Sequence, residues 1–259
     1  MVRGVAVRFK SYEETIPKML NLIKFDEEIK KHDRIILKPN LIKGEKETAT
    51  KPDFLEQVLK FCSEHKNPGT EILIAEGCDG HETTDVFNEL GFTQLAEKYG
   101  IGLIDLNNTE TEEIENSEFL GFDSIRYPKI LLDSFIISLP LLRKDEEIGV
   151  SASLDNMVGA FPAKHYKSFF SGTKNKIKKF PAKYQIHDII KCKMPNFAVI
   201  DASPYKTIIA GQPLEMDKQA AKVLGLDWRN IEHLRIIDES LSGEKEEESE
   251  VKELIEESS

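Results

Sequence analysis

The chain has 259 residues, of which 40% are hydrophobic, and a net charge of −11. This length and composition suit either one large packed domain or two small ones. The longest apolar run, Ile130 to Leu142, is interrupted by Asp133 and Pro140 and is shorter than the roughly 20 residues that span a bilayer. We therefore expect no membrane segment and, since the amino terminus lacks a signal-peptide pattern, a cytoplasmic protein.

Strands and helices alternate along the first 106 residues. Short continuous apolar runs such as Arg34–Lys38 are typical of strands that are buried on both faces of a parallel sheet. Ser11, with Glu14 three residues later, has the pattern of a helix-capping box, and Thr50 is the expected cap of the next strong helix. The predicted strands are 2–9, 34–38, 71–76 and 102–106, and the predicted helices follow Ser11 and cover 48–65, 84–90 and 92–99.

The second half of the chain has weaker signals. Residues 107–121 are acidic and lack clear periodicity, so we expect a surface connection there. Strands are predicted at 124–127, 134–139, 197–202 and from 206, and helices at 186–192, 213–224 and 228–237. Residues 148–154 are either a further strand or a short extended segment. The alternation favours a Rossmann-like, three-layered α/β fold with a largely parallel sheet and helices on both faces. The sequence does not decide whether there is also a smaller second lobe.

The negative charge is concentrated at the end of the chain. Residues 238–259 contain ten acidic residues and two lysines, so the rest of the chain is close to neutral. This stretch has too little apolar surface to fold alone. We predict a single α/β domain over residues 1–237, with any lobe boundary near 107–124, and an acidic, disordered tail over 238–259.

The three cysteines, Cys62, Cys78 and Cys192, are far apart and form no CxxC pair. This spacing excludes a sequence-readable zinc ribbon and a self-contained iron-sulfur cluster. We expect all three to be reduced thiols.

Polar residues follow two of the predicted parallel strands, where α/β proteins bind ligands. Lys38 and Asn40 end one strand, and Glu76 leads into the loop that contains Asp79 and His81. A lysine in a buried strand needs a partner, so Lys38 is expected either to pair with Glu76 or to contact a ligand. The loop is either a capped surface loop or a divalent-metal site formed by Glu76, Asp79 and His81. It contains neither a P-loop nor GxGxxG, so it predicts no nucleotide site.

The stretch SASLDNMVGAFPAKH, residues 151–165, is the centre of the predicted site. It supplies the candidate ligand-binding residues Ser153, Asp155, Asn156 and Lys164. His165, together with His81 in the earlier loop, is a candidate acid or base because imidazole titrates near neutral pH.

Residues 156–187 contain seven lysines and no acidic residue, interleaved with aromatic residues from 161 to 184. Lysines contact phosphates and aromatic rings stack on bases, so this segment could bind single-stranded nucleic acid. Two stronger alternatives are a mobile lid that carries Lys164 and His165 over an anionic small molecule, and a surface loop that the acidic tail neutralises.

The order of these motifs resembles the prokaryotic family called domain of unknown function three-six-two, often labelled as uncharacterised iron-sulfur-centre proteins. The resemblance covers roughly residues 35–234 and rests on short motifs in a fixed order: Lys38-Pro39-Asn40, Thr50-Lys51-Pro52, Ser153 to Gly159, Lys164-His165 and the region of Asp217.

This sequence departs from the family pattern in three ways. It looks like a short member, because it has neither the ferredoxin module of many members nor the cysteines for it. Asp155 stands where the family commonly has a lysine, and the segment 141–147 lacks a histidine that the resemblance would lead us to expect. The family has no general reaction that the resemblance could transfer.

We therefore expect a cytoplasmic enzyme or enzyme-like protein that binds an anionic small molecule in a crevice at the strand carboxyl ends. The sequence identifies no cofactor beyond the divalent-metal alternative, and it does not define the oligomeric state. The competing interpretations are a non-catalytic nucleic-acid-binding module and a redox accessory protein without its own iron-sulfur module.

Overall fold

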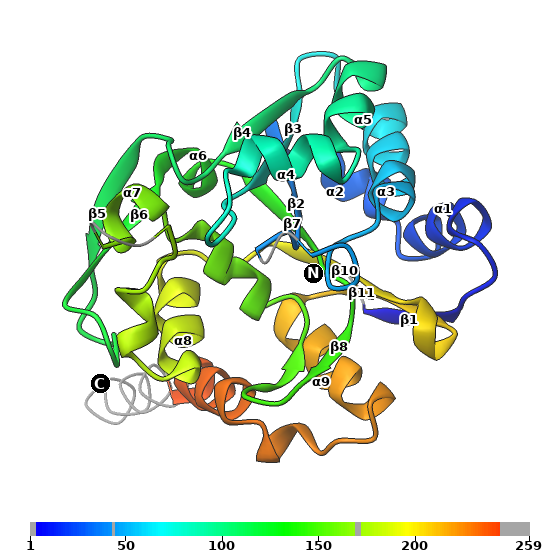
Figure 1. The fold of residues 1–259 in the computed structure, drawn as a ribbon. Coiled ribbons are helices and arrows are strands. Elements are labelled where there is room, and N and C mark those ends of the chain that lie inside the picture. Colours follow the sequence, from blue (N-terminus) through cyan, green and yellow to red (C-terminus); the bar gives the residue numbers. More distant parts are fainter. Residues whose placement is uncertain (1–3, 43–44, 169–171, 244–259) are drawn as a thin grey trace, which may run out of the picture.

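A seven-stranded sheet forms the centre of the computed structural model, which describes residues 4–42, 45–168 and 172–243 (Figure 1). Its strand order is β1-β11-β10-β7-β2-β3-β4. The strands are β1 (Val5–Arg8), β2 (Arg34–Pro39), β3 (Glu71–Glu76), β4 (Gly102–Asp105), β7 (Phe135–Leu139), β10 (Phe197–Ala202) and β11 (Thr207–Gly211). Neighbours from β10 to β4 are parallel, whereas β11 is antiparallel to both β10 and β1. The largely parallel sheet is confirmed.

Two hydrophobic cores lie on opposite faces of this sheet, because successive side chains of a strand point to opposite faces. Ile35 and Leu37 of β2 belong to one core, and Ile36 belongs to the other. All three side chains are fully buried. The continuous apolar run in β2 therefore follows from burial on both faces.

Helices cover both faces and make the fold three-layered. The first core is closed by α1 (Tyr12–Leu22), α2 (Phe25–Ile29), α3 (Pro52–His65), α4 (Thr83–Glu89) and α5 (Phe92–Tyr99). The second core is closed mainly by the 3₁₀ helix η1 (Asp155–Ala160), α8 (Ala182–Cys192) and α9 (Pro213–Val223). Shorter helices are α6 (Lys129–Leu132), α7 (Ala163–Tyr166), η2 (Ile177–Lys179), η3 (Ser203–Tyr205) and η4 (Trp228–Asn230).

Two small antiparallel sheets are added to the second face. One pairs β5 (Thr111–Glu115) with β6 (Ser124–Pro128), and the other pairs β8 (Arg143–Asp145) with β9 (Gly149–Ser151). The prediction of a plain surface connection over 107–121 was wrong, because β5 lies within it. The TEEIE sequence of β5 has a weak strand signal of its own, and pairing with β6 supplies its hydrogen bonds.

The cap expected for α1 is present, since the Ser11 hydroxyl accepts a hydrogen bond from the Glu14 N–H at 3.2 Å. The cap expected for α3 was wrong. Thr50 precedes the helix and instead joins the segments that follow two neighbouring strands. Its hydroxyl donates to the Leu139 carbonyl at the end of β7 at 2.5 Å and accepts from the Asn40 N–H after β2 at 2.7 Å. These bonds hold the chain after β2 against the end of β7.

Residues 232–243 are helical, with Leu234 and Ile237 buried, so this helix passes through the predicted domain boundary at 238. The rest of the predicted acidic tail, residues 244–259, lies outside the described residues. None of the helices in the described part of the chain is both long and apolar enough to cross a membrane.

Candidate functional site

A buried polar network joins the carboxyl ends of β2 and β3 to η1. The ammonium of Lys38 donates to Glu76 Oε1 at 2.8 Å and to the backbone carbonyl of Asn156 at 2.8 Å. It also lies 3.2 Å from Asn156 Oδ1. The side-chain amide of Asn156 in turn donates to the Lys38 carbonyl at 3.1 Å. None of these three residues has any solvent exposure.

Lys38 is therefore fully satisfied inside the protein. An ammonium group has three N–H donors, and the three contacts with Glu76 and Asn156 use all of them. Glu76 is satisfied as well, since its two oxygens accept further hydrogen bonds from the N–H groups of Gly77 and Leu41. Of the two roles expected for Lys38, the structure shows pairing with Glu76.

Gly159 leaves the room that this network needs. A Cβ atom at this position would lie 2.0 Å from Glu76 Oε1 and 2.8 Å from Lys38 Nζ. We expect Gly159→Ala to lower the free energy of unfolding by about 1–3 kcal/mol, because the ion pair must move to admit the methyl group. Denaturant unfolding of the two proteins measures this difference, and an unchanged midpoint would contradict the close approach.

The network continues through two serines to α9. Asn156 donates to the Ser138 hydroxyl at 3.0 Å, and that hydroxyl donates to the Ser153 carbonyl at 3.0 Å. Asp217 then accepts three bonds, from the Ser153 hydroxyl and N–H at 2.5 and 2.9 Å and from the Leu154 N–H at 2.9 Å. Burial raises the pKa of Asp217 to about 7 against the effect of these bonds. Ser153 and Asn156 thus hold η1 on the sheet.

A pocket of about 190 Å³ opens beside this network, at the carboxyl end of β2. Asn40 comes from the segment after β2, Arg143 from β8, and Asp155 from the start of η1. The other lining residues are Ile42, Asp145, Glu147, Ile148, Val158, Ala182, Gln185 and Ile186. The pocket therefore combines one guanidinium, two amides and three carboxyl groups with an aliphatic wall.

Arg143 and Asp155 are connected through a serine. Arg143 and Ser151 are cross-strand partners in the β8–β9 hairpin, and the Arg143 guanidinium donates to the Ser151 hydroxyl at 2.9 Å. The same hydroxyl donates to Asp155 Oδ2 at 2.7 Å. Burial raises the pKa of Asp155 to about 6, although the bonds from Ser151 and the Ala152 N–H favour the charged form. Asp155 can thus exchange a proton near neutral pH.

Two donors at this pocket have no acceptor within the described residues. The Nε of Arg143 is buried and makes no hydrogen bond there. The side chain of Asn40 is only 6% exposed, and its one hydrogen bond in the described part of the chain is accepted by Oδ1 from the Ile42 N–H at 3.5 Å. Its amide N–H₂ makes no hydrogen bond in the described part of the chain and can donate to a ligand or to water at the pocket.

The other predicted site residues lie elsewhere. Asp79 forms an ion pair with Lys178 at 2.8 Å. The Lys164 ammonium donates to the Thr109 carbonyl, and His165 Nε2 lies 3.2 Å from the Thr111 hydroxyl beside β5. His81 is exposed on its loop. None of these residues lines the pocket, so the single crevice expected from both motifs is not formed.

The predicted metal ligands Glu76, Asp79 and His81 do not gather. Within residues 4–42, 45–168 and 172–243, no group of three or more His, Cys, Asp and Glu side chains could hold a metal ion. Glu76 is buried with Lys38, whereas His81 is exposed to solvent. The physical reason is that Lys38 already supplies the positive charge that Glu76 requires.

Several residues of the lysine-aromatic segment are packed against the body of the protein, although most of its lysines are exposed. Phe161 and Tyr166 are buried and meet edge to face at 5.0 Å, so they offer no stacking surface. Lys174 is also buried, and its ammonium donates to the carbonyls of Gly77 and Gly159 at 2.7 and 3.2 Å. Residues 169–171 of this segment lie outside the described residues.

The sequence did not single out Arg143 as a site residue. The only signal was indirect, since Arg143 lies in the segment 141–147 that departs from the expected family pattern. A backbone bridge between Leu141 and Asp201 carries the chain from β7 into the β8–β9 hairpin, and this hairpin points Arg143 at the pocket. That placement depends on tertiary pairing.

Comparison with known proteins identifies the family. A family model described as Domain of unknown function (DUF362) matches residues 35–218. The chain belongs to the DUF362 family. Both the buried network and every lining residue of the Arg143 pocket lie within the part of the chain that matches DUF362. A search of curated proteins found no match.

Proposed function

We propose that this DUF362 protein binds a small molecule that carries a carboxylate or another anionic group in the pocket formed by Asn40, Arg143 and Asp155. The observation that carries the proposal is the buried Nε of Arg143, which has no acceptor in the described part of the chain. An unpaired buried donor costs about 1–3 kcal/mol, and an anionic ligand would remove that cost. The neighbouring Asn40 amide offers a second donor.

The other side of the pocket favours a ligand with hydrogen-bond donors. Asp145, Glu147 and Asp155 all line it, so a large or multiply charged anion would be repelled. A hydroxyl or amino group next to the anionic group would donate to Asp155. The volume of about 190 Å³ also indicates a small ligand, because drug-sized ligands need pockets of at least about 300 Å³.

If the protein is an enzyme, Asp155 is the residue we propose for proton transfer. Its raised pKa of about 6 lies close to neutral pH, where an acid or base works best. Arg143 would hold the anionic group and keep the ligand oriented. This assignment moves the proposed proton-transfer role from His81 and His165 to Asp155.

A cytoplasmic location is part of this proposal. Cys62, Cys78 and Cys192 are free thiols, and disulfides are rare in the reducing cytoplasm. The nucleic-acid alternative has less support, since two of the aromatic rings expected to stack on bases, those of Phe161 and Tyr166, are buried. The redox accessory alternative has no specific observation in its favour.

The test is a calorimetric titration with small carboxylates, using acetate, glycolate and glycinate as probes. We expect the parent protein to bind glycolate or glycinate more tightly than acetate, because only these probes can also donate to Asp155. Arg143→Gln should weaken binding at least about tenfold, which corresponds to about 1.4 kcal/mol for the lost charged hydrogen bond.

Lys144→Gln is the matched control, because it removes the same charge from the next residue of β8, which is exposed. It should leave the affinity of the protein unchanged. Equal affinity of the parent and Arg143→Gln for all three probes, or no binding of any probe to the parent, would show that the pocket does not have this function.

A further inference from the structure

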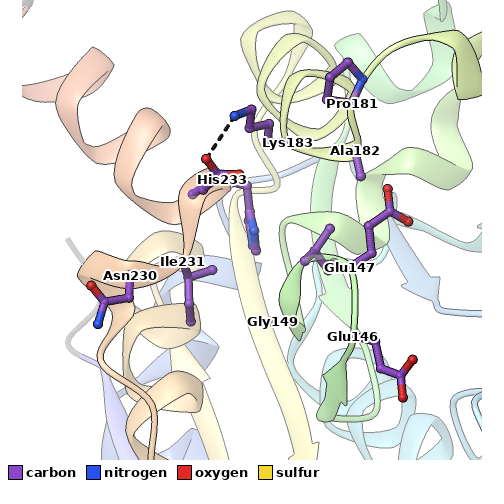
Figure 2. A pocket seen from close by; sticks show the side chains of 11 residues that line it. Glu146, Glu147, Gly149, Pro181, Ala182, Lys183, Asn230, Ile231 and His233 are labelled. Atoms are coloured by element: carbon purple, nitrogen blue, oxygen red, sulfur yellow. Dashed lines mark hydrogen bonds and ion pairs between the residues drawn. The ribbon is translucent and has the colours of Figure 1, made fainter.

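A second and larger pocket, of about 560 Å³, lies between the turn of the β8–β9 hairpin and the start of the chain's last described helix (Figure 2). Its walls are the turn residues 146–149, the start of α8 at 181–183, and residues 230–233. Residues 230–233 lie beyond the span matched by the family model. This pocket therefore contains a wall that the shared family region does not supply.

His233 is the decisive residue in this pocket. Its side chain is 1% exposed, and Nε2 is buried without a hydrogen-bond partner in the described part of the chain. Figure 2 shows the imidazole extending from its helix toward the side of the pocket formed by the hairpin. Such unpaired buried polar groups are rare in folded proteins, so this ring indicates that the pocket takes a ligand.

The imidazole is neutral at physiological pH. Burial lowers the pKa of His233 to about 4, and the opposing effect of the nearby Asp145 is smaller. One nitrogen of a neutral imidazole accepts a hydrogen bond and the other donates one. His233 therefore adds no positive charge to the pocket, and it can accept a bond from a ligand N–H.

Carboxylates give the pocket a net negative charge. Glu146, Glu147 and Glu232 line it, and Lys183 is the only lysine or arginine that does so. Lys183 is already paired with Glu232 at 2.9 Å, which the dashed line in Figure 2 marks. No ion pair neutralises Glu146 or Glu147 within the described residues, and both are exposed at the hairpin turn. The pocket is therefore suited to a cation.

The remaining wall is aliphatic. Ile148 lines the pocket from the hairpin turn. Figure 2 shows Ile231 beside the last described helix and Pro181 and Ala182 at the start of α8. We propose that this pocket binds a small organic cation, namely a primary ammonium on a short aliphatic chain. The ammonium donates to His233 and is attracted by the carboxylates of Glu146 and Glu147, and the aliphatic chain lies on Ile148 and Ile231.

The adjacent Arg143 pocket has the same numbers of acidic and basic lining side chains, three and one, but a different unpaired group: the buried Nε of Arg143 is a donor, whereas the neutral imidazole of His233 can accept. The two share Glu147, Ile148 and Ala182, so they adjoin across the hairpin turn, but Arg143 lines only the smaller pocket and Glu146 and His233 line only the larger one. Because Glu147 lines both pockets, the two proposed sites are distinguished by the charge of the ligand that binds and by the response of His233, which lines only the larger pocket.

The test compares n-butylammonium chloride with sodium butyrate by calorimetry at constant ionic strength. The parent protein is expected to bind butylammonium saturably and butyrate at least about tenfold more weakly. The variant with Glu146→Gln and Glu147→Gln should lose at least about fivefold in affinity for butylammonium. Glu97→Gln, an exposed acid on α5, is the control and should bind as the parent does.

The imidazole resonances of His233 give a second readout that needs no mutation in the interior. They are expected to shift during the butylammonium titration of the parent and to saturate with the calorimetric curve. The proposal is overturned if butylammonium does not bind, if butyrate binds as well, if the Glu146/Glu147 variant keeps the parent affinity, or if the His233 resonances do not move.

Discussion

Replacing Lys38 by methionine is expected to lower the free energy of unfolding by about 3–5 kcal/mol, far more than a typical surface substitution does. The reason is that Glu76 would keep its charge in a position with no solvent exposure and lose its ion pair. Asn156 would also lose the donor to its carbonyl and side-chain oxygens. Chemical denaturation monitored by circular dichroism measures the loss.

A double variant separates the lost pair from the lost packing. With Lys38→Met and Glu76→Gln together no buried charge is left unpaired, so stability should recover part of the way toward the parent value. Lys144→Met, at an exposed lysine, should change the free energy of unfolding by no more than about 0.5 kcal/mol. A Lys38→Met protein as stable as this control would mean that the pair does not form.

Asp217→Asn is expected to cost about 2–3 kcal/mol at neutral pH, because an amide N–H₂ must replace one of the two carboxylate oxygens that accept from Ser153 and Leu154. Such a replacement brings two donors together in a position with no solvent exposure. Equilibrium unfolding of parent and variant at pH 7 gives this value.

The pH dependence of the stability difference between the parent and Asp217→Asn tests the raised pKa of Asp217 directly. Burial raises the pKa of Asp217 from 3.8 to about 7, so the folded state binds the proton more tightly than the unfolded state. The part of the stability that comes from protonation of Asp217 is therefore fully present below about pH 4 and is lost as the pH rises to about 7, by at most about 1.4 kcal/mol per pH unit. The difference in unfolding free energy between parent and Asp217→Asn should shrink across this window.

The subtraction of one protein from the other removes the contributions of titrating groups that do not interact with Asp217. The charge of Asp155, whose pKa is raised to about 6, interacts with Asp217 and contributes to the difference. Asp217→Glu is not a suitable control, since its longer side chain would overfill the site. Asp123→Asn removes an exposed carboxylate in the segment before β6 and is the control for the loss of one negative charge. A difference for Asp217→Asn that stays constant or grows from pH 4 to pH 7 would contradict the raised pKa.

The buried strands could be predicted from the sequence because their signal is local. The observed bounds of β3 and β10, Glu71–Glu76 and Phe197–Ala202, coincide with the predicted ranges. Each is a short apolar run that is buried along nearly its whole length. The strands β5 and β8 were not predicted, because each is short and polar and is stabilised by pairing with a later strand.

In the candidate site, too, some contacts could be predicted from the sequence and others depend on tertiary structure. Neighbouring parallel strands bring their carboxyl ends together, so the pairing of Lys38 with Glu76 could be foreseen. The approach of Arg143 to Asn40 could not, because it depends on the register of the β8–β9 hairpin and on the turn that leads into it. The position of His233 in a pocket could not be predicted either, because an isolated histidine in a predicted helix does not reveal whether its ring is buried.

The pairing of β1 with β11 has a consequence for how the chain folds during synthesis. Val5 to Arg8 pair with Ala210 to Thr207, so the first strand finds its partner only after about 200 further residues have been made. At 5–20 residues per second the ribosome takes roughly 10–40 s to supply them. During that interval the apolar residues of β1 have no strand to pair with, and early chaperone binding to the nascent amino terminus would protect them from aggregation.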